Sequence, residues 1–300
     1  NLITDIPGLY VGNADDEQKK TGVTMLIGDK PLTAGVHIMG GSPGTRETDL
    51  LNPDKMIQKV DALVLSGGSV FGLDAASGVV DSLKKNGKGF PTSIFPIPIV
   101  PTAILFDLNN GGEKDWSINP YRELGLQAYS NATINFEIGS KGAGYGANTL
   151  DLKGGLGSSS LLLHNGIKVG ALVAVNSIGS TVVNTSKNFW AAPFELGNEF
   201  GGHGPAKDFS NLNLSWEKIK PFRGHSTTIG IVATNAQIDQ AQATRMATAA
   251  HDGIARSIYP SHTPFDGDLI FATSTNQIEL ESSVLDLMKI GHAAANCLSR

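Results

Sequence analysis

Three hydroxyl side chains stand together at the start of a strongly apolar run. Ser226, Thr227 and Thr228 directly precede the Ile-Gly-Ile-Val-Ala segment at 229–233. A hydroxyl held at the start of a strand becomes a nucleophile when a base takes its proton, and it then attacks a carbonyl carbon. The ordinary alternative is that these β-branched residues only begin a strand. Composition alone favours that alternative, and the hydroxyls alone therefore do not establish an enzyme.

Two carboxylates bracket a glycine in a second segment. Asp266, Gly267 and Asp268 stand just before another apolar run. A carboxylate pair can orient a nucleophile and hold or accept its proton. The ordinary alternative is an acidic turn. The spacing also resembles part of a calcium loop, but the remaining oxygen ligands of an EF-hand are absent from the sequence.

The sequence lacks other familiar catalytic and cofactor-binding motifs. Residues 67–71 lack the final glycine of a nucleophile elbow, because Phe71 occupies that position. The sequence contains neither a dinucleotide-binding fingerprint nor a P-loop. Its 7 histidines show no spacing typical of metal ligands. The single cysteine, Cys297, excludes an internal disulfide and any multi-thiolate zinc site. We expect no metal and no cofactor.

The charge balance excludes some partners. Lys and Arg total 23 against 28 for Asp and Glu, a formal charge of −5. Such a chain has no electrostatic footprint for nucleic acid and no polybasic patch for anionic membranes. No apolar run approaches the ~18 residues of a membrane span. We expect a cytoplasmic protein, with a periplasmic location left open because the chain begins at Asn1 rather than Met.

The elements that must position these side chains are short strands and amphipathic helices. Apolar, β-branched runs predict strands over 22–27, 35–39, 62–65, 169–175, 228–233 and 269–272. Apolar spacing of three and four predicts helices over 70–85, 120–128, 236–258 and 284–298. Strands flanked by such helices predict helix layers packed on sheet, in one α/β domain over 1–300. Cys297 falls on the apolar face of the last helix, as a core residue.

Eight motifs occur in order along nearly the whole chain. They lie at residues 3–12, 40–49, 66–76, 142–144, 153–158, 169–176, 227–230 and 262–268. Together they resemble the L-aminopeptidase/D-esterase family (DmpA type, peptidase family S58) of self-cleaving N-terminal-nucleophile hydrolases, which includes β-aminopeptidases and nylon-oligomer hydrolases. The resemblance implies an αββα sandwich, of the type shared with ornithine acetyltransferases, with two sheets between helix layers. It implies no cofactor.

The resemblance also implies that the chain cuts itself. In this family a Ser or Thr at the start of a central strand attacks the preceding carbonyl and becomes a new N-terminus. Its own α-amine, with a reference pKa of ~7.7–8.0, then serves as general base. Relatives place the nucleophile seven residues before a Thr that corresponds to Thr234. This identifies Thr227 as the nucleophile and predicts an α chain of 1–226 and a β chain of 227–300.

Ser226 leaves a second cleavage site open. Relatives commonly have Asn or Gly just before the scissile bond, so cleavage before Ser226, with Ser226 as nucleophile, remains an alternative. The strand register favours Thr227, because a slip of one residue would turn the hydroxyl to the opposite face of the sheet.

Further roles are implied by position in the family motifs. Asn176 resembles the side-chain amide that donates to the oxyanion. Asp266 and Asp268 resemble the acidic pair that orients the hydroxyl and amine of the nucleophile. A lysine of the nylon-hydrolase branch corresponds to Asp151 or, after a gap, to Lys153, which makes Lys153 a candidate.

One family position departs from the pattern. A tyrosine found near the oxyanion in several relatives is replaced by Phe106, which has no phenolic donor.

The expected activity is aminopeptidase cleavage of small peptides or amides through an acyl-enzyme. An endo-acting 6-aminohexanoate-oligomer hydrolase is the close alternative. From other classes, an ornithine acetyltransferase-like acyltransferase and an uncleaved, non-catalytic scaffold both remain open. The resemblance further implies a homo-oligomer, a tetramer of α/β heterodimers.

Overall fold

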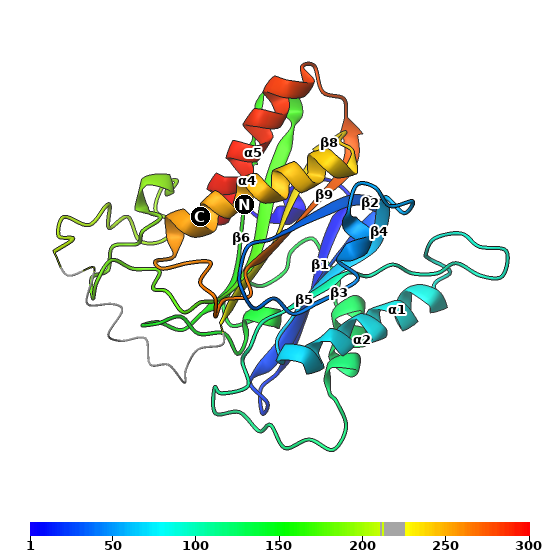
Figure 1. Cartoon of the computed structure of the whole chain (residues 1–300), viewed down its shortest axis with the longest axis horizontal. Coiled ribbons are helices and arrows are strands. Elements are labelled where there is room, and N and C mark those ends of the chain that lie inside the picture. Colours follow the sequence, from blue (N-terminus) through cyan, green and yellow to red (C-terminus); the bar gives the residue numbers. More distant parts are fainter. Residues whose placement is uncertain (211, 213–225) are drawn as a thin grey trace.

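Four layers make up the fold. A computed structural model describes residues 1–210, 212 and 226–300, so His225 and most of the segment before Ser226 lie outside the described residues. Helices α1 (Ala75–Lys85) and α2 (Tyr121–Ser130) cover one outer face of the strands, and α4 (Gln240–Ser257) and α5 (Ser283–Ser299) cover the other (Figure 1).

One long strand joins the two halves of the sheet. The described strands are β1 (Leu9–Asp16), β2 (Thr21–Ile38), β3 (Thr45–Arg46), β4 (Lys59–Ser66), β5 (Thr102–Ile104), β6 (Gly155–Leu162), β7 (Lys168–Asn176), β8 (Thr227–Ala236) and β9 (Leu269–Ile278). Their order is β3-β5-β4-β2-β9-β8-β7-β6, and β1 pairs with β2. Residues 23–27, 32 and 33 of β2 pair with β4, and residues 33–38 pair with β9. The pairing with β4 shifts register between Ile27 and Leu32.

Alternating side chains fill three apolar cores. Leu26 and Leu65 from one half of the sheet meet Leu172, Ile231 and Phe271 from the other half in an inner core. The residues between them point outward and pack against α1 and α2, or against α4 and α5. Successive strand residues face opposite sides of a sheet, so each half of the sheet has one face toward the inner core and one toward a helix pair. The layers therefore follow the order helix, sheet, sheet, helix. The predicted αββα sandwich is confirmed, with its two sheets continuous through β2.

Several predicted boundaries differ from the structure for local reasons. The strands predicted over 22–27 and 35–39 are the two ends of β2. The helix predicted over 236–258 begins only at Gln240, because β8 extends to Ala236 and Asp239 caps the helix by accepting the Gln242 N–H at 2.7 Å. The helix predicted over 70–85 starts as a 3-10 turn, Ser69–Asp74, before α1.

Strands β1 and β6 and the short strands β3 and β5 were not predicted. β6 reads Gly-Leu-Gly-Ser-Ser-Ser-Leu-Leu, a composition that disfavours strands. Its hydroxyls are satisfied in the fold: Ser158 donates to the Ala171 carbonyl and Ser159 to the Cys297 carbonyl, both at 2.8 Å. Cys297 is buried as predicted, and burial raises the pKa of its thiol to about 11. Among the described residues, no helix combines the length and apolarity needed to cross a bilayer.

Candidate active site

The end of β7 and the starts of β8 and β9 meet at one end of the sheet. Asn176, the last residue of β7, pairs directly with Thr227, the first residue of β8. Asp268 immediately precedes β9, and Asp266 forms a parallel bridge with Ser226. The structure thus brings together four of the residues predicted from sequence, and Ser226 beside them.

Thr227 and Asn176 share the inner face of the sheet. Opposite residues of an antiparallel ladder project to the same side. Ala174 and Ile229, each two residues further along its strand, both lie in the inner core. Only 4% of Thr227 is exposed. The register that places Thr227 inward turns Ser226 toward the opposite face.

The Thr227 hydroxyl lies against the peptide bond that precedes it. Its Oγ1 donates to the Ser226 carbonyl oxygen at 2.6 Å. The Gly267 N–H donates to the same oxygen at 2.9 Å. A Cβ at Gly267 would stand 2.7 Å from Thr227 Oγ1, so only glycine fits at this position. The carbonyl that self-cleavage would attack is therefore close to the hydroxyl and already hydrogen-bonded.

Asp268 anchors the peptide on the other side of Thr227. Its Oδ1 accepts the Thr228 N–H at 2.8 Å. Its Oδ2 accepts the His262 backbone N–H at 3.0 Å and lies 2.8 Å from Nδ1 of the same imidazole. Only 1% of Asp268 is exposed. The carboxylate therefore fixes the start of β8 relative to the 260–268 turn.

Asp266 ties together two loops that border the site. Its Oδ2 accepts the Thr263 hydroxyl at 2.6 Å and the Thr263 N–H at 3.0 Å, and its Oδ1 accepts the Ile178 N–H at 3.4 Å. Burial, followed by the negative charge of Asp268, raises the pKa of this carboxyl. In the uncut chain Asp268 thus holds the backbone next to Thr227, and Asp266 joins the turn before β9 to the segment after β7.

Asn176 uses its amide to join two further segments. Its Oδ1 accepts the Asn148 N–H at 2.9 Å, and its Nδ2 donates to the Phe106 carbonyl at 2.9 Å. A carboxamide nitrogen carries two N–H groups, so a second donor remains for a ligand. Phe106 therefore lies beside Asn176, as its match to the family tyrosine implied, and contributes its backbone carbonyl.

Lys153 is hydrogen-bonded to the 142–147 loop. Its ammonium donates to the carbonyls of Ala147 at 2.7 Å and of Gly144 and Gly154 at 3.3 Å. Burial lowers the pKa of Lys153. This loop leads to Asn148 and so to Asn176. The hydrogen bonds of Lys153 thus connect it to the site through the loop.

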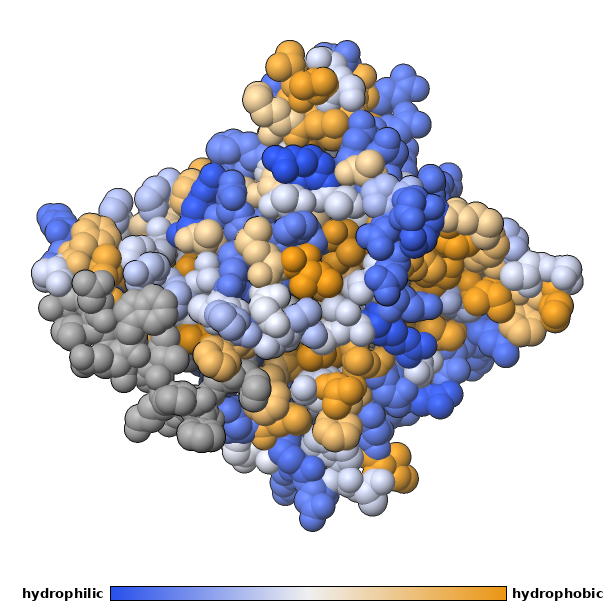
Figure 2. All heavy atoms as spheres, in the orientation of Figure 1, coloured by the Kyte–Doolittle hydropathy of each residue, from blue (hydrophilic) through white to orange (hydrophobic). Residues whose placement is uncertain are grey.

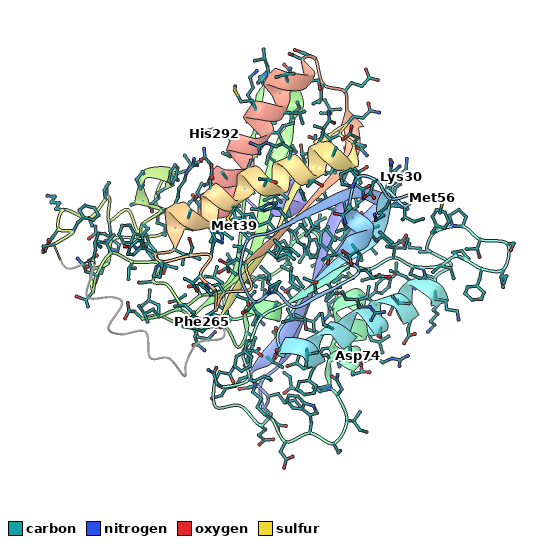
Figure 3. All side chains as sticks on the ribbon, viewed as in Figure 1. Lys30, Met39, Met56, Asp74, Phe265 and His292 are labelled. Carbon is teal, nitrogen blue, oxygen red and sulfur yellow. The ribbon has the colours of Figure 1, made fainter. Side chains whose placement is uncertain are left out.

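Sequence reasoning did not single out the backbone groups that build the site. Gly40 donates its N–H to the Asp268 carbonyl at 3.0 Å, and a Cβ at Gly40 would stand 2.2 Å from the Asp268 nitrogen. Ser42 donates its N–H to the Asp266 carbonyl at 2.9 Å. The glycine pair at 40–41 was the available signal, because glycine permits such close approach. Phe265, labelled in Figure 3, is 51% exposed in the adjoining turn.

A cavity of about 550 Å³ lies on the other face of the same sheet region. Val173 and Val175 of β7 line it, together with Phe189, Phe200 and Leu298. These valines alternate with Ala174 and Asn176, which face inward. The valines that line the cavity therefore face away from the Thr227 hydroxyl, whereas Lys153 and the inner-core residue Leu156 also contribute to the lining. Among the described residues, no group of three or more His, Cys, Asp or Glu side chains could hold a metal ion.

The layered fold, with Thr227 at the start of an inner strand, is that of an N-terminal-nucleophile hydrolase, and the sequence comparisons define the family. Residues 1–300 match Peptidase family S58, and the chain belongs to this family. An uncharacterized aminopeptidase of Mycobacterium tuberculosis is 38% identical over 100% of this chain and 92% of its own length. A 6-aminohexanoate-oligomer endohydrolase of Paenarthrobacter ureafaciens is 26% identical over 93% of this chain and 76% of its own length.

Solved structures agree on the fold. An L-aminopeptidase D-Ala-esterase/amidase from Ochrobactrum anthropi, described as a variant of the N-terminal-nucleophile hydrolase fold, superposes with a TM-score of 0.70 at 20% identity. A Burkholderia β-aminopeptidase gives a TM-score of 0.68 at 19% identity. Each comparison covers 100% of this chain and 84% of the other.

Proposed function

We propose that this chain cleaves itself between Ser226 and Thr227, and that the mature protein is an aminopeptidase with Thr227 as its N-terminal nucleophile. The observation that carries the proposal is the position of Thr227 Oγ1, 2.6 Å from the carbonyl oxygen of the bond to be cut. Membership of peptidase family S58 supports the hydrolase class.

Self-cleavage proceeds by attack of Thr227 Oγ1 on the Ser226 carbonyl carbon. The hydroxyl proton leaves as the C–O bond forms, and the Gly267 N–H, 2.9 Å from the carbonyl oxygen, stabilises the negative charge on that oxygen. The C–N bond then breaks and the nitrogen takes up that proton, which gives an ester between Ser226 and Thr227 and frees the Thr227 α-amine. Water hydrolyses the ester and frees the Ser226 carboxylate and the Thr227 hydroxyl.

The freed amine supplies the base for substrate hydrolysis. A terminal α-amine has a reference pKa of ~7.7–8.0, so it can take the Thr227 hydroxyl proton near neutral pH. The second N–H of Asn176 then donates to the oxyanion of the acyl-transfer intermediate. Asp266 and Asp268 orient the amine and hydroxyl by holding the backbone around them. Lys153 supports Asn176 through the 142–147 loop.

The relatives favour exo-acting over endo-acting hydrolysis. The mycobacterial proteins named aminopeptidases are 38% identical to this chain, against 26% for the endohydrolase of Paenarthrobacter ureafaciens. We therefore propose small peptides and amides with a free amino end as substrates. Cleavage of 6-aminohexanoate oligomers is the second candidate, since that relative still covers 93% of the chain.

Three variants test the nucleophile. Thr227→Ala is expected to remain one folded chain without activity toward amino-acyl p-nitroanilides. Thr227→Ser keeps a hydroxyl and is expected to mature and to retain activity. Ser226→Ala removes the other hydroxyl and is expected to mature like the wild type.

Each outcome decides between named alternatives. Maturation or turnover by Thr227→Ala would exclude Thr227 as the nucleophile. Failure of Ser226→Ala alone would assign the cut to Ser226. Turnover of 6-aminohexanoate oligomers in preference to amino-acyl p-nitroanilides would replace the aminopeptidase with the endohydrolase, and acetyl transfer from acetyl-ornithine to glutamate would indicate the acyltransferase.

A further inference from the structure

Three histidine rings lie in a row where α4 packs against β2. His37 comes from β2, His251 from α4 and His262 from the turn before β9. The ring centroids of His37 and His251 are 5.1 Å apart and those of His251 and His262 are 5.0 Å apart, both edge to face. Figure 3 labels Met39, two residues beyond His37, close to α4. No sequence motif predicts this cluster, and the proposed chemistry does not use it.

The third histidine, His262, lies beside the Asp268 carboxylate of the candidate site. Nδ1 of His262 lies 2.8 Å from Asp268 Oδ2, within ion-pair distance but without the alignment of a hydrogen bond, and the His262 side chain is only 13% exposed. The other oxygen of Asp268 accepts the Thr228 N–H at 2.8 Å. One imidazole is therefore linked through one carboxylate to the peptide that follows Thr227.

His262 adopts a backbone conformation that few residues prefer. Its φ is +55°, in the left-handed region where Asn, Asp and His are enriched among non-glycine residues. The ring is thereby directed toward Asp268, and His251 packs behind it. His251 is 2% exposed, and its Nε2 lies 3.0 Å from the His37 carbonyl oxygen, which fixes the ring against which His262 rests.

We propose that His262 is a positioning residue for hydrolysis, which holds Asp268 against the Thr228 N–H and thereby fixes the hydroxyl and the freed amine of Thr227. The inference rests on the proposed function of Thr227. A displacement of about 1 Å at a reacting group can cost on the order of 10²-fold in rate. Because His262 acts on the geometry of the nucleophile, its loss changes kcat and leaves substrate binding nearly unchanged.

The decisive comparison is between His262→Gly and His262→Asn. Glycine tolerates the positive φ but removes the imidazole, and we expect kcat per cleaved site to fall about tenfold or more with KM within twofold. Asparagine also tolerates this φ, and its Nδ2 takes the place of the imidazole Nδ1 beside Asp268 Oδ2. His262→Asn is therefore expected to keep kcat within about threefold of wild type. His292→Ala, on the exposed side of α5, is the matched control and is expected to leave both constants unchanged.

A second pair keeps the test decisive if His262→Gly does not fold or mature. His262→Asp has the size and backbone preference of asparagine but places an acceptor against Asp268, so its kcat should fall at least tenfold below that of His262→Asn. Equal kcat values across His262→Asn, His262→Asp and wild type would overturn the inference. So would a loss confined to KM or to thermal stability. These results leave Thr227 in place, whereas an uncut, inactive wild-type protein would instead contradict the proposed function.

Discussion

The carboxamide of Asn176 has a structural role at the end of β7 and, in the proposed mechanism, a chemical one. It accepts the Asn148 N–H and donates to the Phe106 carbonyl, which fixes the amide plane opposite Thr227. A donor held in this way needs no reorganisation when charge develops on a nearby oxygen. Loss of the amide should therefore affect the transition state more than substrate binding.

We predict that Asn176→Ala lowers kcat on the order of 10² or more while KM changes little. Asn176→Asp is the matched variant, because it keeps an acceptor for the Asn148 N–H and removes the donor. It should lose kcat to a similar extent with a smaller loss of thermal stability. The measurement is kcat per cleaved site. A loss below about threefold for both variants would remove Asn176 from the mechanism.

Single residues were predicted to different extents. Family motifs at the ends of apolar runs predicted that Thr227, Asn176, Asp266 and Asp268 lie together, and the structure places them at one end of the sheet. Their catalytic roles remain predictions. The partners of these residues could not be predicted in this way. The Gly267 N–H and the Phe106 carbonyl act through contacts between segments far apart in sequence, and no local pattern encodes such contacts.

At the scale of elements, helix α4 carries one buried histidine against β2. His251 makes its polar contact at 3.0 Å with the His37 carbonyl oxygen. Burial, and then the neighbouring His262 and His37, lowers the pKa of His251 to about 4, although the contact with the His37 backbone acts in the opposite direction. The reference pKa is 6.5. The folded protein therefore holds this ring neutral, and unfolding allows it to take up a proton below pH 6.5.

The lowered pKa of His251 predicts a pH-dependent stability. The contribution of His251 is fully present above about pH 6.5 and is lost as the pH falls toward 4, by about 2 kcal/mol between pH 7 and pH 5. His251→Gln keeps an amide near the Nε2 position without titrating. In the uncut Thr227→Ala background, urea unfolding at pH 7 and pH 5 should show a smaller decrease for His251→Gln than for His251. Parallel decreases would contradict the lowered pKa.

The elements themselves were predicted where periodicity is strong. The four long helices and β4, β7, β8 and β9 follow apolar spacing that local sequence encodes. Two features depend on tertiary pairing instead. The Ser-rich β6 is a strand because β7 pairs along its whole length, and the two strands predicted within β2 join because different partners pair with its two ends.

At the scale of the whole molecule, the predicted cut lies directly before β8, a central strand of the sheet. Strand β8 lies between β7 and β9, and β9 pairs with β2. The β chain of 227–300 would contribute β8, α4, β9 and α5, and its inner-core residues pack against those of 1–226. The hydrogen bonds between β8 and β7 and between β9 and β2 should therefore hold the two chains together after the peptide bond before Thr227 is cut.

We predict that the two chains remain associated after cleavage. They should elute as one species from a sizing column in native buffer and separate only in denaturant. Recovery of a free 227–300 fragment in native buffer would contradict the observed sheet order.

The expected tetramer remains a prediction. Figure 2 shows apolar atoms exposed where α5 begins, and Val284, Leu285 and Met288 are 79%, 54% and 63% exposed there.

The intact mass of the purified wild-type protein under denaturing conditions tests self-cleavage most directly. The position of Thr227 Oγ1, 2.6 Å from the Ser226 carbonyl oxygen, predicts two masses, those of residues 1–226 and 227–300, with threonine as the first residue of the smaller chain. A single mass for residues 1–300, or a smaller chain that begins with Ser226, would contradict Thr227 as the N-terminal nucleophile.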